Sequence, residues 1–459
     1  MVALQTVCIR KLGQQRSGEV RFGRWLRNWR VSVKALIEGV CGAISTRVAG
    51  RHVLLLEDTS EINYQAHAGR VEGLGKVGNG KDVGLFLHPV LAIDAQAGTC
   101  LGLAHLYLWL RTRKKEPGYQ KRPIEDKESG RWIEAARQGL QRTATARMAT
   151  VIADREADIY EMFDRLPNAG KASTHLLIRA CRDRSLVGPR EPALHDAPGE
   201  SHGPSQNLFS WLSGLPEQER YEVDLPASQS QGKDHRSAHR AQLVVRFGRT
   251  QIQRPQYADR SASKAIALWA IDVCEDESSV LDQEKPVHWR LLTTHEITSA
   301  QQARQCIDWY RQRWHIEQLF RTLKRQGLDV ESSQLEEAGR LQKLVVLAAS
   351  AAVHTLQLTL AREGHDVRPA SDCFDEEEQA LLKDVNPTLE GATVKQKNPH
   401  TMASLAWAAW IVARLGGWKG YASERKPGPI TMLNGLQALA QIHRGWAPGS
   451  WDRLDVCIR

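Results

Sequence analysis

The sequence predicts an α/β fold in which a mixed sheet is followed by a largely helical C-terminal region. Apolar runs that end in acidic residues, at 53–58 and 149–154, are typical of buried strands. Apolar-periodic stretches over 334–362 and 404–415 predict helices instead. With 459 residues, the chain is long enough for a substantial core and two or three domains.

Composition restricts the class of protein. The eight cysteines are scattered and form no C-x-x-C pair, which favours reduced thiols over disulfides or a zinc site. The N-terminus lacks the layout of a signal peptide, and no apolar run is expected to be long enough to span a membrane. The closest run, 405–415, is short and contains Arg414. We therefore expect a cytoplasmic protein without a membrane partner.

The positive charge is concentrated at the N-terminus. Residues 1–51 contain ten Lys or Arg residues and two Glu residues, a net charge of +8 in a chain whose formal charge is +9. Such a distribution favours a polyanionic partner, nucleic acid first, although a solvated surface has the same composition. Trp25 and Trp29 lie among these arginines and favour DNA, or they form the core of a helix.

The apolar run at 53–58 reads as a strand that ends in Asp58. The ends of central strands are where open α/β sheets place functional side chains, but an Asp before Thr and Ser is also a common turn residue. The Gly-rich stretch 73–80 lacks the spacing of a nucleotide-binding loop and is expected to be a flexible connection. Strands are predicted at 85–93 and 101–110, with a turn at 94–98 between them, and a helix at 127–142.

The run at 149–154 repeats this arrangement and ends in Asp154. Residues 155–163 then read as the start of a helix with acidic residues in its first turn. Asp158 is either a second functional carboxylate or a local cap. The next strand is expected at 174–180.

Residues 308–324 contain no Gly or Pro and are predicted to form one helix. At about 100° per residue, four polar side chains fall within roughly 60° of one another: Tyr310, Arg313, Glu317 and Lys324. A carboxylate flanked by Arg and Lys is suited to holding a metal ion beside a phosphate. The alternative is a solvated face with an Arg313–Glu317 ion pair.

Two strand-end Asp residues and a helical Glu occur in the order β-β-β-α-β-α-β … α. This is the layout of an RNase H-like nucleotidyl-transfer core. Three carboxylates at one site can hold two divalent ions about 3.5–4 Å apart. The sequence therefore predicts a catalytic and metal-binding triad of Asp58, Asp154 and Glu317.

On these residues the chain resembles bacterial insertion-sequence transposases of the DDE class, the cut-and-paste type that carries a Tyr-Arg-Glu-Lys signature. The matching pieces are 57–60, 154–160, 411–417 and the spacing from Tyr310 to Lys324. The resemblance implies that the triad binds two Mg²⁺ ions, for which Mn²⁺ can substitute. It also implies that Tyr310, Arg313 and Lys324 contact DNA phosphates, and that a homodimer pairs the transposon ends before they join target DNA.

The resemblance also divides the chain into expected domains. A β-rich insertion subdomain interrupts an RNase H-like mixed-sheet catalytic core, and Trp289, on the strand that returns to the core, is expected either to stack on a flipped DNA base or to pack internally. The expected boundaries are a shortened basic helical DNA-binding segment at 1–51, the core at 52–180 and 287–345, the insertion at 181–286, and a helical dimerisation region at 346–459.

The resemblance implies a DNA transposase associated with the nucleoid. Two alternatives stay open. Because the basic segment is short, the chain could be a transposase remnant that binds DNA without cutting it, and the same fold would also serve a structure-specific nuclease.

Overall fold

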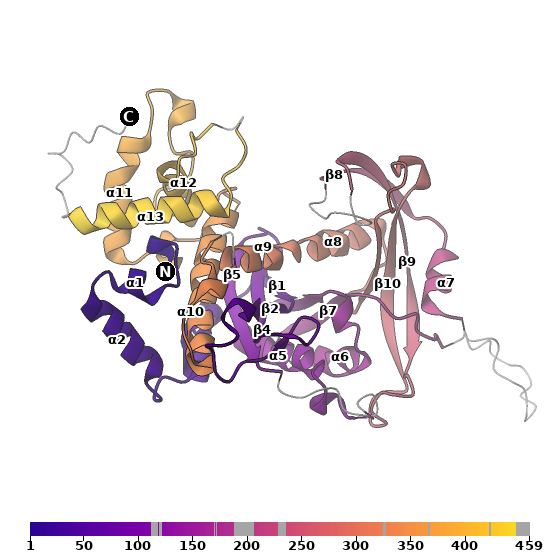
Figure 1. Ribbon diagram of the computed structural model, residues 1–459. Coiled ribbons are helices and arrows are strands. Elements are labelled where there is room, and N and C mark those ends of the chain that lie inside the picture. The colour runs from indigo at the N-terminus through magenta and orange to yellow at the C-terminus, as the bar shows by residue number, and fades with distance from the viewer. Residues whose placement is uncertain are drawn as a thin grey trace, which may run out of the picture. The chain divides into compact units, whose positions relative to one another are not determined.

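A computed structural model of the chain describes residues 1–111, 118, 122–168, 170, 172–187, 206–227, 236–324, 327–365, 368–421 and 424–446. The chain forms two compact units, whose elements are labelled in Figure 1. Unit 1 comprises residues 1–53, 58–114 and 314–459, and unit 2 comprises residues 54–57 and 115–313.

A mixed sheet forms the centre of unit 2. Strands β6 and β7 pair in parallel, whereas the pairs β7–β11, β11–β10, β10–β9 and β9–β8 are antiparallel. The α/β class and the mixed sheet predicted from the sequence are therefore confirmed. In sheet order the strands are β1 (His52–Glu57, with 54–57 in this unit), β6 (Met148–Ala153), β7 (Ser173–Arg179), β11 (His288–Thr293), β10 (Ala265–Glu275), β9 (His239–Gln253) and β8 (Glu219–Leu225).

Burial explains the difference in sequence pattern between the strands. In β1 and in β6, five of the six residues are buried, as expected for continuous apolar runs that are covered on both faces. Strand β8, at the edge of the sheet, has no buried residue and alternates between exposed and partly buried positions. Asp58 and Asp154 each follow one of the two buried strands directly.

The strands of the expected insertion extend the sheet of unit 2 through the pairing of β10 with β11. Residues 188–205 and 228–235 of this segment lie outside the described residues. Helix α7 contacts β9 and β10 (Figure 1). The helices of unit 2 are α5 (Gly130–Arg142), α6 (Tyr160–Arg165), α7 (Leu208–Ser213) and α8 (Ala300–Arg311), with short 3₁₀ turns η4 (Ile124–Asp126), η5 (Arg155–Ala157), η6 (Leu166–Asn168) and η7 (Glu277–Ser279).

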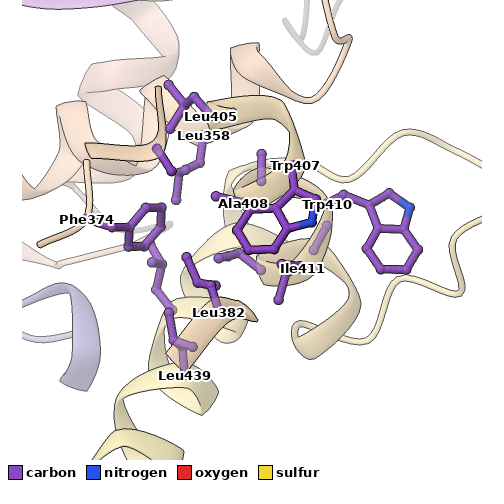
Figure 2. Close-up of a cluster of buried hydrophobic side chains, with 14 of the residues drawn as sticks. Leu358, Phe374, Leu382, Leu405, Trp407, Ala408, Trp410, Ile411 and Leu439 are labelled. Atoms are coloured by element: carbon purple, nitrogen blue, oxygen red, sulfur yellow. The ribbon is translucent and has the colours of Figure 1, made fainter. Parts of the chain in front are cut away.

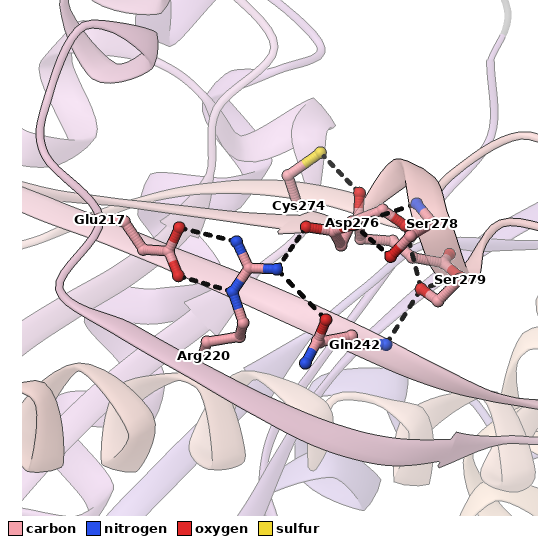
Figure 3. A network of polar contacts seen from close by, with 8 residues as sticks. Glu217, Arg220, Gln242, Cys274, Asp276, Ser278 and Ser279 are labelled. Atoms are coloured by element: carbon pink, nitrogen blue, oxygen red, sulfur yellow. Dashed lines mark hydrogen bonds and ion pairs between the residues drawn. The ribbon is translucent and has the colours of Figure 1, made fainter.

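Polar contacts fasten the edge strand β8, as Figure 3 shows. Arg220 binds Glu217 through Nε at 2.7 Å and Asp276 through Nη1 at 2.5 Å. The carboxylate of Asp276 also accepts hydrogen bonds from the backbone N–H and the hydroxyl group of Ser278 in η7. These ion pairs are solvent-accessible, so water and salt screen them and they orient β8 more than they stabilise it.

Strand β4 (Asp82–Asp94) organises the sheet of unit 1. It pairs antiparallel with β2 (Ser60–Asn63), β3 (Gly75–Val77) and β5 (Cys100–Trp109). The predicted strands at 85–93 and 101–110 are thus confirmed. The expectation of a simple flexible connection at 73–80 is wrong, because residues 75–77 of that stretch pair with β4 as β3.

Unit 1 is otherwise helical. The N-terminal segment folds as several short helices, with Trp29 82% exposed and Trp25 37% exposed. The helices are α1 (Ile9–Gly13), α2 (Arg16–Arg27), α3 (Val33–Cys41), α4 (Ile44–Arg47), α9 (Trp314–Leu323), α10 (Ala338–Ala361), α11 (Glu376–Leu389), α12 (Leu405–Leu415) and α13 (Pro429–Gly445), with 3₁₀ turns η1 (Val2–Leu4), η2 (Gln65–His67), η8 (Val330–Ser332), η9 (Ala370–Asp372) and η10 (Val394–Gln396).

Helix α10 is the central helix of unit 1. Its 24 residues are long and apolar enough to cross a membrane, which corrects the expectation that no apolar stretch reaches that length. That expectation assumed an uninterrupted apolar run, whereas α10 contains Arg340 and Lys343. The helix contacts α3, β5, α9 and α12 and is mostly buried, as expected for a core helix. Lys343 is accommodated because its ammonium group donates to the carbonyl oxygens of Leu26 and Asn28.

The C-terminal helices share an apolar core (Figure 2). Trp407, Trp410 and Ile411 of α12 pack there with Phe374 and Leu382, and each of these side chains is no more than 4% exposed. Helix α12 (Leu405–Leu415) is capped at its N-terminus by Ser404, whose side chain accepts from the N–H of Trp407, and Gly416 is its C-cap. The helices predicted at 334–362 and 404–415 are therefore confirmed, with slightly different ends.

The prediction of one helix over 308–324 is wrong. Helix α8 ends at Arg311 and α9 begins at Trp314. Between them, the N–H groups of Gln312 and Arg313 bond the carbonyl oxygens three residues earlier, those of Trp309 and Tyr310, which is 3₁₀ geometry. Packing explains the break, because Ile307 and Tyr310 are buried in unit 2, whereas Ile316, Leu319 and Leu323 are buried in unit 1.

Candidate active site around Asp154

Asp154 lies at the end of β6, where the chain turns into η5. Its Oδ1 atom accepts a hydrogen bond from the backbone N–H of Arg155 at 2.8 Å. The hydroxyl group of Tyr310, on α8, donates to the same oxygen at 3.2 Å. The Asp154 side chain is 31% exposed, so a ligand can reach the carboxylate. Two residues that the sequence pattern selected independently, Asp154 and Tyr310, therefore lie in direct contact.

Two guanidinium groups face the Asp154 carboxylate. Arg313 Nη2 lies 3.9 Å from Oδ2, and Arg179 Nη1 lies 3.9 Å from Oδ1. Arg179 also donates to the carbonyl oxygen of His288 at 3.0 Å, which holds its side chain in place. One carboxylate and two arginines give the cluster a net positive charge, which favours a phosphate ligand.

The sequence prediction missed Arg179. Because β6 and β7 are parallel, their C-terminal ends lie at the same edge of the sheet. Arg179 is the last residue of β7, and Asp154 directly follows β6. The strand predicted at 174–180 already contained Arg179 near its end. Only the parallel pairing of β6 with β7 shows that this arginine lies beside Asp154.

Tyr310 is a buried phenol that contacts the Asp154 carboxylate. It is 4% exposed, and the ring of Trp289 meets it edge-on with a centroid distance of 5.8 Å. Burial raises the pKa of Tyr310 to about 12, with a further contribution from Asp154, while Arg313 and Arg179 act in the opposite direction. The hydroxyl group therefore keeps its proton at physiological pH and remains a hydrogen-bond donor. Trp289 is half-buried and packs on Tyr310.

Asp158 forms local contacts. It is 1% exposed, and its Oδ2 atom accepts the N–H groups of Cys181 and Arg182 at 2.9 Å. Its Oδ1 atom pairs with Arg184 Nη2 at 2.5 Å. Of the two roles left open by the sequence, the structure therefore supports the local one.

The other predicted residues belong to unit 1. Asp58 directly follows β1, and its Oδ1 atom accepts the N–H of Thr59 at 2.7 Å, as in a turn. Glu317 is half-buried in the first turn of α9, where a negative charge is favourable. Lys324 follows α9 directly, and its ammonium group lies 3.8 Å from Glu331 Oε1. Neither the contact nor Glu331 was anticipated from the sequence.

The carboxylates suit a hard divalent cation in chemical type, because Mg²⁺ prefers oxygen ligands. Within the described residues of either unit, however, no group of three or more His, Cys, Asp or Glu side chains is arranged to hold a metal ion. Asp154 belongs to unit 2, where it lies among two arginines and a tyrosine. Asp58 and Glu317 belong to unit 1.

The mixed α/β fold, with its large mixed sheet and helices, is compatible with an RNase H-like DDE fold. Residues 206–354 match the family model of the transposase DDE domain. The match includes Trp289, Tyr310, Arg313, Glu317 and Lys324, and it begins after Asp154. It supports a transposase of the DDE family, and hence DNA as the partner.

Proposed function

We propose that the chain is an insertion-sequence transposase that cuts DNA at the ends of its element and joins them to target DNA. The observation that carries the proposal is the hydrogen bond between Asp154 and Tyr310, flanked by Arg313 and Arg179. It links a strand-end carboxylate to the Tyr-Arg-Glu-Lys spacing, all four residues of which lie in the matched DDE segment.

In this proposal Asp58, Asp154 and Glu317 are the catalytic residues and together hold two Mg²⁺ ions. When bound, such ions activate the attacking water or 3′ hydroxyl group and stabilise the leaving oxygen of the phosphodiester. Mn²⁺ is expected to substitute, because it also accepts carboxylate oxygens. The metal ions are thus proposed to be held by carboxylates that are distant in the sequence.

Positively charged and aromatic side chains position the DNA. Arg313 offers a planar fork to phosphate oxygens, and Lys324 offers a compact point charge. The Tyr310 hydroxyl group fixes the orientation of the Asp154 carboxylate. Trp289 presents a partly accessible ring, on which an unpaired base can stack. We further propose that a homodimer pairs the two ends through the C-terminal helices and that the protein works at the nucleoid.

The proposal is tested by replacing Asp154 with Asn, which keeps the size of the side chain and its hydrogen-bonding oxygen but removes its charge. Strand cleavage is measured with Mg²⁺ on DNA that carries the terminal repeats of the element. We expect a loss of at least about 10²-fold, since removal of a single electrostatic contact to a transition state can cost about 10²–10³ in rate. The matched control is Asp308→Asn, which removes a 58% exposed carboxylate from α8 and should cleave normally.

Undiminished cleavage by the Asp154→Asn protein would contradict the proposed role. Two further results distinguish the alternatives. Binding of the ends without any cleavage by the unmodified chain would indicate a remnant. Cleavage of branched DNA without terminal repeats and without strand joining would indicate a structure-specific nuclease.

A further inference from the structure

We infer that Glu331 is a positioning residue that holds the ammonium group of Lys324 where it receives a DNA phosphate. The inference rests on the proposed function, because that function makes Lys324 a phosphate ligand. Glu331 lies outside the Tyr-Arg-Glu-Lys spacing, in the short 3₁₀ turn η8. Its Oε1 atom lies 3.8 Å from Lys324 Nζ.

Two hydrogen bonds fix Glu331, one to its side chain and one to the neighbouring backbone. Glu331 Oε1 accepts the backbone N–H of Asn63, at the end of β2, at 2.9 Å. Tyr64, which follows Asn63, is fully buried. Its hydroxyl group donates to the carbonyl oxygen of Val330 at 3.2 Å. The carboxylate therefore has a defined position before DNA arrives, which is the property that a positioning residue requires.

Residues 327–329 are anchored as well. The N–H groups of Gly327 and Asp329 bond the carbonyl oxygen of Lys324, at 3.3 and 2.9 Å, and the N–H of Leu328 bonds that of Thr322. The backbone bonds of residues 327–329 thus tie the chain just before Glu331 to the end of α9, which Lys324 follows. A lysine side chain has several rotatable bonds, so a fixed carboxylate reduces the number of positions its ammonium group samples.

A cavity of about 820 Å³ borders the pair, lined by side chains that include Glu61, His67, Phe320 and Ser332. The side chains of Lys324 and Glu331 are 26% and 18% exposed, so both are shielded but reachable. At 3.8 Å the two charged groups attract each other without a direct hydrogen bond. The ammonium protons therefore stay available to a phosphate oxygen that enters from the cavity.

The experiment compares single-turnover cleavage of terminal-repeat DNA by four proteins: the unmodified chain, Glu331→Gln, Lys324→Met, and the double variant. Gln keeps an oxygen for the Asn63 N–H but has no charge. We expect Glu331→Gln to slow cleavage about tenfold or more, because a misplaced contact of about 1 Å can cost about 10²-fold. In the Lys324→Met background, the same change should have no further effect.

Three outcomes of the cleavage assay would overturn the inference. One is unchanged cleavage by Glu331→Gln. Another is faster cleavage, which would mean that Glu331 competes with phosphate for Lys324. The third is an equal loss in the Lys324→Met background, which would indicate a general structural role. The control is Glu336→Gln, which changes an exposed glutamate in the segment that follows η8 and should cleave normally.

A readout without catalysis separates this inference from the proposed function. Lysines are labelled by reductive methylation with ¹³C-formaldehyde, and the Lys324 signal is assigned by its loss in Lys324→Arg. Glu331→Gln should shift that signal and leave the other lysine signals in place. A shift in a chain that cleaves no DNA would refute the proposed function but not the contact. An unmoved Lys324 signal would refute the positioning role, whatever the activity.

Discussion

At the scale of single residues, the phenol of Tyr310 couples proton binding to folding. Its pKa is raised to about 12 in the folded chain, whereas an unfolded tyrosine has a pKa of about 10. The folded state therefore keeps a proton that the unfolded state loses between these values. The stabilising contribution is complete below about pH 10 and disappears as the pH rises towards about 12.

We predict that Tyr310→Phe removes part of this alkaline dependence. The free energy of unfolding of the unmodified chain should fall more steeply between pH 10 and 12, by up to about 1.4 kcal/mol per pH unit, because Phe has no proton to lose. At pH 7 the variant should be less stable by about 1 kcal/mol, since it lacks the hydrogen bond to Asp154. Denaturant unfolding at several pH values measures both effects, and parallel curves above pH 10 would contradict the coupling.

Spacing along the chain was enough to select some residues that lie together in the structure. Tyr310 and Arg313 were selected from one local pattern, and the structure places both at Asp154, more than 150 residues earlier. Arg179 and Glu331 were missed because spacing along the chain does not mark them. Their roles depend on the parallel pairing of β6 with β7 and on the anchoring of η8 to β2, and no local pattern contains these facts.

At the scale of elements, helices α12 and α13 approach each other through glycine. A Cβ atom at Gly435 would lie 1.8 Å from the carbonyl oxygen of Val412, and one at Gly416 would lie 2.0 Å from that of Thr431. Both obstacles are backbone atoms, which cannot rotate away. The close packing of the two helices therefore requires hydrogen atoms at these positions.

We predict that Gly435→Ala destabilises unit 1 although alanine is the better helix former. Overpacking should lower the free energy of unfolding by about 1–3 kcal/mol. The control is Gly23→Ala in α2, where an added Cβ meets nothing within 4 Å. That change should stabilise the chain by up to about 1 kcal/mol through helix propensity. Denaturant unfolding measures the free energy of unfolding of both variants. If both substitutions changed it in the same direction, the α12–α13 contact would not be tight.

The boundaries of an element were predictable where the local sequence marks them. Strands β4 and β5 and helices α10 and α12 lie close to the predicted ranges, because apolar periodicity and turn residues mark them. The break between α8 and α9 was not predictable, because residues 308–324 contain no Gly or Pro. It follows from burial of the two halves in different units.

At the scale of the whole molecule, charge separates the N-terminal segment from the rest of the chain. Residues 1–51 have a net charge of +8, and the whole chain has +9. Arg24 and Arg30 are exposed, and the guanidinium group of Arg30 lies over the ring of the exposed Trp29 at 5.5 Å. The charge and the exposed aromatic ring suit this surface to DNA phosphates, whose neutralisation releases counterions.

We predict that DNA affinity depends steeply on salt and that the N-terminal arginines produce part of this dependence. A plot of log K against log salt concentration should be linear, and each phosphate contact adds about 0.9 to its slope. The double variant Arg24→Gln, Arg30→Gln should therefore reduce the slope by about two if both residues contact phosphates. The measurement is fluorescence anisotropy of labelled duplex DNA over a range of salt concentrations.

The control separates the position of the charges from their number. Arg137→Gln with Arg240→Gln also removes two positive charges, but these exposed arginines pair with Glu134 and Glu222 outside the N-terminal segment. If residues 1–51 form the contact surface, the control keeps the slope of the unmodified chain. If both double variants reduce the slope equally, the dependence follows from total charge, and the N-terminal segment is not a DNA-binding surface.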